Sequence, residues 1–179
     1  NAPEGTLFVA ECQTGGRGRR GKTWESPAGS GIWMSLLLRP DISPESASML
    51  TLVLAVAMVD AINEEVQDAK CYVKWPNDIV LNNRKISGTL TEMSAEMDSI
   101  HYVVIGIVIN VNTTDFDESI KDMATSIYLG TGKKVKRSNI IAAFSHSFKK
   151  YYEAFLKTQD LTYMVDRYNE LLINKGRTV

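Results

Sequence analysis

The residues best suited to chemistry near the start of the chain form a loop that combines glycines with cations. Residues 15–24 read GGRGRRGKTW, in which glycines are interleaved with Arg17, Arg19, Arg20 and Lys22. Glycine keeps a loop mobile and costs conformational entropy when the loop becomes ordered. A solvated charged turn does not require that mobility, whereas a loop that closes around several phosphates does. The pattern therefore predicts a flexible phosphate-binding loop.

Two familiar kinds of basic loop fit this segment less well. Residues 16–23 match the Walker A pattern G-x-x-x-x-G-K-[ST], but a P-loop needs a helix directly after it. The residues that follow, WESPAGSG, contain Pro27 and two glycines and resist helix formation. A nucleic-acid patch would need a second basic stripe or an aromatic platform, and the formal net charge of the chain is -1. A small anionic ligand is the better prediction.

A second group of useful side chains lies in residues 73–92, VKWPNDIVLNNRKISGTLTE. Pro76 fixes its own φ and biases the preceding residue toward extended geometry, which predicts a corner between two strands with Asp78 beside it. Lys85 lies across the next hairpin, either as a site cation or as a cation at a sheet edge. Gly88 gives up a side chain within a strand, which predicts a bulge or the close approach of a ligand.

The framework that positions both groups follows from the periodicity of apolar residues. Asn82-Asn83 predicts a tight hairpin because asparagine tolerates positive φ. The segment 102–112 is almost wholly apolar, as expected of a central strand buried on both faces. Strands laid down in succession predict an α+β fold rather than a doubly wound one. The expected elements are strands at 6–14, 31–40, 71–74, 79–81, 84–93 and 102–112, and helices from Ser43 to about Val66, from Ser138 and from Asp160.

Composition narrows the class of protein. A chain of 179 residues with 44% hydrophobic residues is long and apolar enough for one globular domain. No stretch approaches the roughly 18 apolar residues that a membrane span needs. Cys12 and Cys71 fall in apolar stretches and are expected to be buried thiols in a reducing compartment. His101 and His146 stand alone, so a zinc site is not expected.

Four stretches of the chain resemble the bacterial biotin protein ligases in order and spacing. They are GRGRRGKTW, KWPNDI, RKISG with LTE, and VIGIVINVN, and ATSIYL at 124–129 extends the similarity. The resemblance implies a catalytic domain over residues 1–179 with a class II synthetase-like α+β fold, in which a mixed or antiparallel sheet packs against helices. It also implies an ATP-dependent ligase that forms biotinyl-5′-AMP and passes biotin to a lysine of a biotin carboxyl carrier protein.

The same resemblance assigns residues to the site. The expected catalytic residues are Lys85, Arg17 and Asp78. Lys85 matches the lysine that bridges the biotin carboxylate and the α-phosphate, while Asp78 either orients or deprotonates the acceptor lysine or only caps its own turn. Gln13 matches the residue that hydrogen-bonds the ureido ring of biotin, and Trp24 the residue that shields adenine. Residues expected at biotin are Gln13, Gly16, Arg17, Gly18, Arg19, Lys85, Gly88 and Gly106. Residues expected at ATP or the adenylate are Arg19, Arg20, Lys22, Trp24, Lys85 and Asn110.

The implied cofactors are ATP and Mg²⁺, without assigned metal ligands. The implied partners are biotin, ATP and the carrier domain of acetyl-CoA carboxylase, in the cytoplasm and away from membranes. DNA binding is expected only if a helix-turn-helix lies outside these residues, and a homodimer is left open. Two alternatives remain: a lipoate or octanoate ligase or transferase of the same fold, and a non-enzymatic biotin-sensing half of a repressor.

The chain departs from the family pattern at several places. The central strand of the family usually reads I-G-x-G-I-N, whereas Val108 replaces the second glycine here, which is expected to narrow the pocket or weaken binding. Ser87 stands where a small apolar residue is common. An upstream Ser-Thr-Asn stretch and a small C-terminal β domain find no match in the chain. The chain is therefore expected to be truncated, with impaired or no activity.

Overall fold

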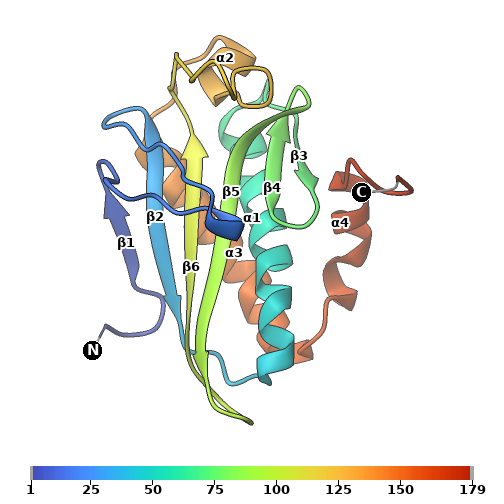
Figure 1. The fold of residues 1–179 in the computed structure, drawn as a ribbon. Helices are drawn as coiled ribbons and strands as arrows, with labels where there is room; N and C mark the ends of the chain where they lie inside the picture. Colours follow the sequence, from blue (N-terminus) through green and yellow to red (C-terminus); the bar gives the residue numbers. More distant parts are fainter. Residues whose placement is uncertain (1, 178–179) are drawn as a thin grey trace.

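A computed structural model of the protein describes residues 2–177 and shows one sheet with helices packed against a single face (Figure 1). Six strands form the sheet in the order β1-β2-β6-β5-β4-β3, and every pairing between them is antiparallel. The α+β prediction is confirmed, in its antiparallel form. The strands are β1 (Leu7–Ala10), β2 (Gly31–Leu38), β3 (Cys71–Lys74), β4 (Asp78–Leu81), β5 (Arg84–Ala95) and β6 (Ile100–Asn110).

The two faces of the central strand β6 differ in burial. Ile105, Ile107 and Ile109 are fully buried in the core on the helix side, whereas Val104 and Val108 alternate with them and are only half-buried. Side chains alternate along a strand, and the helices cover one face only (Figure 1). The prediction of a strand buried on both faces is therefore wrong. We call the face that carries Val104 and Val108 the open face.

The helix α1 (Met49–Glu65) lies in the core on the helix side of the sheet and packs against α3 (Arg137–Thr158), after a 3₁₀ turn at Pro44–Ser48. By length and composition alone, the stretch Pro44–Glu65 would suffice to cross a membrane, so the expectation that no such stretch exists is wrong. Most of it is buried inside the domain, as is usual for a core helix. The predicted capping hydroxyl of Ser43 contacts the hydroxyl of Ser46 at 3.1 Å instead of a backbone N–H.

The other helices follow the predicted periodicity with small shifts. α3 begins at Arg137, one residue before the predicted capping Ser138, and Lys136 occupies the cap position. Asp160 accepts a hydrogen bond from the N–H of Thr162 at 2.9 Å, just before the 3₁₀ turn that leads to α4, and Leu161 occupies the cap position of that turn. The remaining helical elements are α2 (Ile127–Thr131), α4 (Val165–Leu171) and the 3₁₀ turns Arg19–Gly21 and Thr162–Met164.

The first strand is shorter than predicted. β1 ends at Ala10 instead of continuing to residue 14, because the chain leaves the sheet there. Cys12 is consequently exposed, which contradicts the prediction of two buried thiols. Cys71, at the start of β3, is buried, and this burial raises the pKa of its thiol to about 12. The predicted hairpin is confirmed, with φ of 52° at Asn82 and 62° at Asn83.

Candidate active site

The basic loop between β1 and β2 is folded as a narrow two-stranded ribbon, which we call the basic ribbon (residues 11–30). Gln13 pairs with Ser26 and Arg17 with Thr23 through isolated antiparallel bridges. The tip is a 3₁₀ turn at Arg19–Gly21, drawn in blue in front of the sheet in Figure 1. No helix follows Thr23 before β2 begins, so the Walker A interpretation is wrong.

The stem of the ribbon depends on Gly16 and on a side-chain pair. A Cβ atom at Gly16 would lie 2.4 Å from the carbonyl oxygen of Trp24 and 2.8 Å from Oε1 of Gln13. Gly16 is therefore required by the fold of the ribbon itself. The buried Ser26 donates its hydroxyl to Oε1 of Gln13 at 2.8 Å, which fixes the orientation of that amide. Ser26 was missed from the sequence because a serine in a polar loop gives no signal of burial.

A β-bulge brings Lys85 to the open face. In the β4–β5 pairing, Ile79 lies opposite Ser87 but Val80 lies opposite Lys85, so Ile86 is an extra residue on β5. In a regular strand, Lys85 would point to the face opposite Gly88, three residues later, because side chains alternate. The extra residue reverses this, as bulges re-aim side chains.

The ammonium group of Lys85 is held by Asp78. Nζ of Lys85 lies 2.6 Å from Oδ1 of Asp78, and the two side chains are 34% and 26% exposed. Asp78 therefore pairs with Lys85 rather than only capping its own turn. The backbone of Lys85 is paired on both sides, with β4 and with the segment 123–125, so the interpretation as an edge cation is wrong.

Gly88 leaves room for this ion pair. A Cβ atom there would lie 3.2 Å from both Cε and Nζ of Lys85 and 3.6 Å from Oδ1 of Asp78. Of the two features that the sequence predicted for Gly88, a bulge lies nearby, at Ile86. The group that approaches Gly88 is the Lys85 side chain, and the approach of a ligand stays a prediction.

Two contacts hold the basic ribbon across the open face. Nη1 of Arg19 donates to Oδ1 of Asn77 at 2.9 Å, and the amide of Asn77 in turn donates to the carbonyl of Thr89 at 2.8 Å. The ammonium of Lys85 lies 5.2 Å from the ring centre of Trp24, within cation–π range. The ribbon tip and Lys85 are thus on the same side of the molecule, as the sequence predicted.

The residues of β6 that were expected near the ligand differ in their packing and contacts. A Cβ atom at Gly106 would be 3.6 Å from its nearest neighbour, an ordinary contact, so packing does not require glycine there. Val108, where the resemblance led us to expect a glycine, lies opposite Gly88 on β5, on the open face. Asn110 is buried and donates to the carbonyl of Thr125 at 3.2 Å, so it supports the segment that pairs with Lys85.

The remaining cations of the ribbon point into solvent. Arg17, Arg20 and Lys22 are exposed, and none of the side-chain hydrogen bonds or ion pairs within residues 2–177 involves them. Gly18 lies between them, and its N–H donates to the carbonyl of Lys22 at 2.7 Å. These ribbon cations, together with Lys85, make this side of the molecule suited to an anionic ligand.

A comparison with models of protein families decides the family. The model described as "Biotin/lipoate A/B protein ligase family" matches residues 1–110, which include the ribbon, the Lys85 bulge and β6. The chain belongs to the biotin/lipoate A/B protein ligase family.

Two relatives of known name are both described as ligases. The "Bifunctional ligase/repressor BirA" of Bacillus subtilis is 48% identical over 158 residues, which are 87% of this chain and 48% of the relative. The "Biotin--[acetyl-CoA-carboxylase] ligase" of Paracoccus denitrificans is 32% identical over 147 residues, or 80% of this chain and 61% of the relative. The chain therefore spans about half the length of the BirA protein that it matches.

The solved structures agree with this family assignment. The biotin protein ligase from Aquifex aeolicus, solved in complex with biotin and ATP, is 31% identical and superposes with a TM-score of 0.84 over 97% of this chain and 71% of that one. The predicted class II synthetase-like ligase fold is confirmed.

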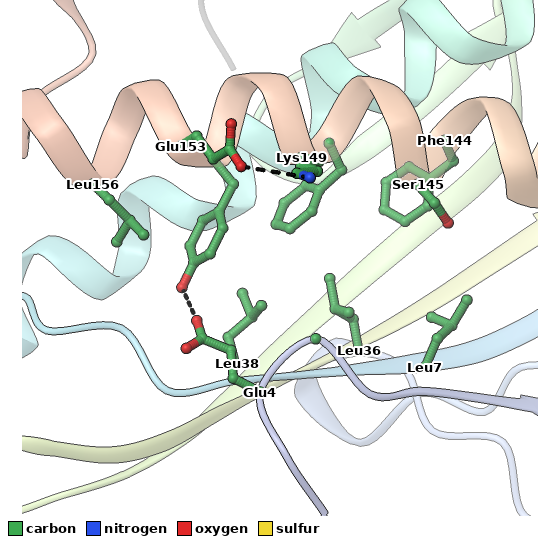
Figure 2. Close-up of a pocket in the computed structure, with 12 residues that line it drawn as sticks. Glu4, Leu7, Leu36, Leu38, Phe144, Ser145, Lys149, Glu153 and Leu156 are labelled. Carbon is green, nitrogen blue, oxygen red and sulfur yellow. Dashed lines mark hydrogen bonds and ion pairs between the residues drawn. The ribbon is translucent and has the colours of Figure 1, made fainter.

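An apolar groove of about 440 Å³ lies away from this ligase-family site. It runs between α3 and the β1–β2 edge, on the helix side of the sheet (Figure 2). Leu36, Leu38 and Phe144 line it, and Tyr152 donates its hydroxyl to Glu4 at 2.6 Å across one end. None of the residues expected at biotin or ATP lines this groove.

Proposed function

We propose that this chain carries the catalytic machinery of a biotin protein ligase, which activates biotin with ATP and then transfers it to a lysine of a carrier protein. One observation carries the proposal: the Lys85 ammonium is turned onto the open face by a bulge and lies beneath the arginine-rich ribbon. The name of the relative from Paracoccus denitrificans supports biotin as the substrate, and the structure from Aquifex aeolicus contains biotin and ATP. They do not favour lipoate or octanoate.

In the first proposed step, a carboxylate oxygen of biotin attacks the α-phosphorus of ATP. A new P–O bond forms, the bond to the bridging oxygen of pyrophosphate breaks, and biotinyl-5′-AMP results. Because both reactants are negative, the step needs cations placed in advance. Lys85 supplies one between the two anions, and Arg17 and Arg19 of the ribbon supply others. The Lys85–Asp78 pair is partly exposed, so Lys85 can exchange its partner for the ligand at small cost.

In the second proposed step, the amine of the carrier lysine attacks the biotinyl carbonyl, an amide bond forms and AMP leaves. The amine must be neutral to attack. Once Lys85 binds the adenylate, the carboxylate of Asp78 is available to orient this amine and to accept its proton. The two members of this ion pair thus serve different steps: Lys85 is the cation of the first step, and Asp78 accepts the proton in the second.

Other residues of the site bind rather than react in this proposal. Gln13, oriented by Ser26, hydrogen-bonds the ureido ring, and Trp24 covers the adenine. Gly106 lets the ligand approach the backbone of β6. Mg²⁺ bound to the ATP phosphates would neutralise part of their charge. No group of three or more His, Cys, Asp or Glu side chains suited to a metal occurs in residues 2–177.

Mass measurement of a carrier domain tests the proposal. The protein is incubated with biotin, ATP, Mg²⁺ and a biotin carboxyl carrier domain, and the carrier should gain one biotinyl group. Lipoate in place of biotin should give no gain. Calorimetry should show tighter binding of the adenylate than of biotin. Transfer of lipoate but not biotin would assign the chain to the other branch of the family.

The wider setting is proposed from the resemblance. We place the reaction in the cytoplasm, and residues 1–179 would be its catalytic domain. A homodimer and DNA binding stay predictions from the resemblance, because the proposed chemistry needs neither.

A further inference from the structure

The two ends of the basic ribbon meet at one guanidinium group. Arg137, the first residue of α3, places Nη2 3.0 Å from Oε1 of Glu11 and Nη1 3.3 Å from Oε2 of the same carboxylate. Its Nη1 also donates to the carbonyl of Gly31 at 3.1 Å. Glu11 follows β1 directly, and Gly31 begins β2. A single side chain therefore bridges the entry and the exit of the ribbon.

Glu11 is also influenced by the exit side of the ribbon. The hydrogen bond from Arg137, helped by the charge of that residue, holds the pKa of Glu11 below its usual value. The backbone of Gly29, on the exit side, contributes to lowering the pKa of the Glu11 carboxyl. We call these contacts of Arg137, Glu11, Gly29 and Gly31 the ribbon clamp.

The clamp lies at the opposite end of the ribbon from the contacts that reach the site. Arg19 binds Asn77 from the tip, and Trp24, between the tip and the clamp, lies over Lys85. Both of these contacts must rearrange when the phosphates of a ligand bind, because Arg19 and Lys85 are expected to contact the ligand. The clamp at Arg137 involves none of the residues expected at biotin or ATP, so it can persist while the tip exchanges partners.

We infer that Arg137 is a positioning residue: it anchors the base of the basic ribbon so that Gln13 and the arginines are held over the open face. The expected effect on biotin binding rests on the proposed function, but the anchoring of the ribbon by Arg137 does not. Arg137 acts through Glu11, two residues before Gln13, and touches no reacting atom. Its removal should loosen the ribbon and weaken retention of biotin and its adenylate, with little effect on the chemical step.

The expected effect of removing Arg137 can be judged from the solvent exposure of Arg137 and Glu11. The side chain of Glu11 is 64% exposed, and exposed ion pairs contribute little. The side chain of Arg137 is 30% exposed and its bond to Gly31 is partly buried, which adds a charge-assisted hydrogen bond to the pair. The population of the open ribbon should therefore rise about five-fold, not a hundred-fold, when Arg137 is removed.

Limited trypsin digestion measures ribbon opening without any ligand. The ribbon contains four trypsin sites, at Arg17, Arg19, Arg20 and Lys22. Cleavage at these sites, followed by mass spectrometry, should be about five-fold faster in Arg137→Ala than in the wild type. Arg137→Lys keeps a charge beside Glu11 but cannot bridge both ends with a planar fork, so its cleavage rate should be intermediate.

Arg39→Ala is the matched control. Arg39 also donates from a terminal guanidinium nitrogen to a backbone carbonyl, that of His101 at 2.9 Å, but lies beyond the other end of β2. Its loss should leave cleavage in the ribbon at the wild-type rate. Equal rates in Arg137→Ala and the wild type, or equal acceleration in Arg39→Ala, would overturn the inference. If Arg137→Ala does not fold, Glu11→Ala, at an exposed position, takes the same test.

Kinetics then separate positioning from a merely structural role. In Arg137→Ala, the KM for biotin and the dissociation rate of the adenylate should rise about five-fold, while kcat at saturating biotin stays within two-fold. A fall in kcat with unchanged KM would overturn the positioning role. If the wild-type protein does not bind biotin at all, the proposed function fails, while the trypsin result still decides the clamp.

Discussion

Replacing Gly88 by alanine tests the geometry that places Lys85. The new Cβ atom would lie 3.2 Å from both Cε and Nζ of Lys85, closer than side chains normally pack. The side chain of Lys85 must therefore move by a few tenths of an ångström. The lysine side chain is flexible and its carboxylate partner is only 2.6 Å from Nζ, so the ammonium group, rather than the backbone of β5, is expected to move.

This displacement should affect catalysis far more than stability. Lys85 is partly exposed and can adjust, so the free energy of unfolding should change by less than about 1 kcal/mol. Catalysis is more sensitive to position, because a misplacement of about 1 Å can cost about 100-fold in rate. A shift of a few tenths of an ångström should therefore slow adenylation by about 10-fold.

Single-turnover pyrophosphate release with biotin and ATP measures adenylation, and thermal unfolding measures stability. Gly106→Ala is the matched control: it lies on the neighbouring strand, and its Cβ atom would be 3.6 Å from the nearest atom. It should keep the adenylation rate at saturating biotin, although the KM for biotin should rise because the ligand is proposed to lie above it. A wild-type adenylation rate in Gly88→Ala would refute the reasoning.

Three further predictions concern single groups. Lys85→Ala should abolish biotinyl-5′-AMP formation, measured as pyrophosphate release, and full adenylation would contradict its role. Arg17→Ala should form the adenylate but release it, measured by ultrafiltration, and wild-type retention would contradict this. Burial, together with a hydrogen bond to Asp60, raises the pKa of Tyr151 to about 12, above its ordinary value of about 10. The stabilisation this gives is complete below pH 10 and lost as pH rises through 12. Urea unfolding between pH 10 and pH 12 should show that the free energy of unfolding falls less steeply with pH in Tyr151→Phe than in the wild type. An equally steep fall in both proteins would contradict this role of Tyr151.

Local sequence patterns predicted the strands, turns and helices well where the residues that determine the element lie in one short segment. The hairpin at Asn82-Asn83 formed as expected, because both residues tolerate the positive φ that it needs. The helix predicted from Ser43 to about Val66 appears as a 3₁₀ turn and α1 over nearly the same residues. The errors concern exposure: Cys12 lies in an apolar stretch but is exposed, because β1 is an edge strand that ends before it.

The candidate site was predicted in part. Lys85 and the basic ribbon lie together on the open face, but the partners of each group were not predicted. Asn77 receives Arg19 across 58 positions of sequence, and Glu11 receives Arg137 across 126. Neither pair leaves a local pattern, because any exposed amide or carboxylate could serve as the acceptor.

The sequence by itself determined which segments become strands and helices, since backbone preference and hydrophobic period are properties of neighbouring residues. It also determined the family, through four motifs in register. Only the tertiary structure decided the face on which Lys85 lies, because the bulge at Ile86 depends on how β4 and β5 pair. It likewise decided that the helices cover one face of β6 and leave the other to the ribbon. Such choices depend on register and packing between distant segments, which no single stretch of sequence specifies.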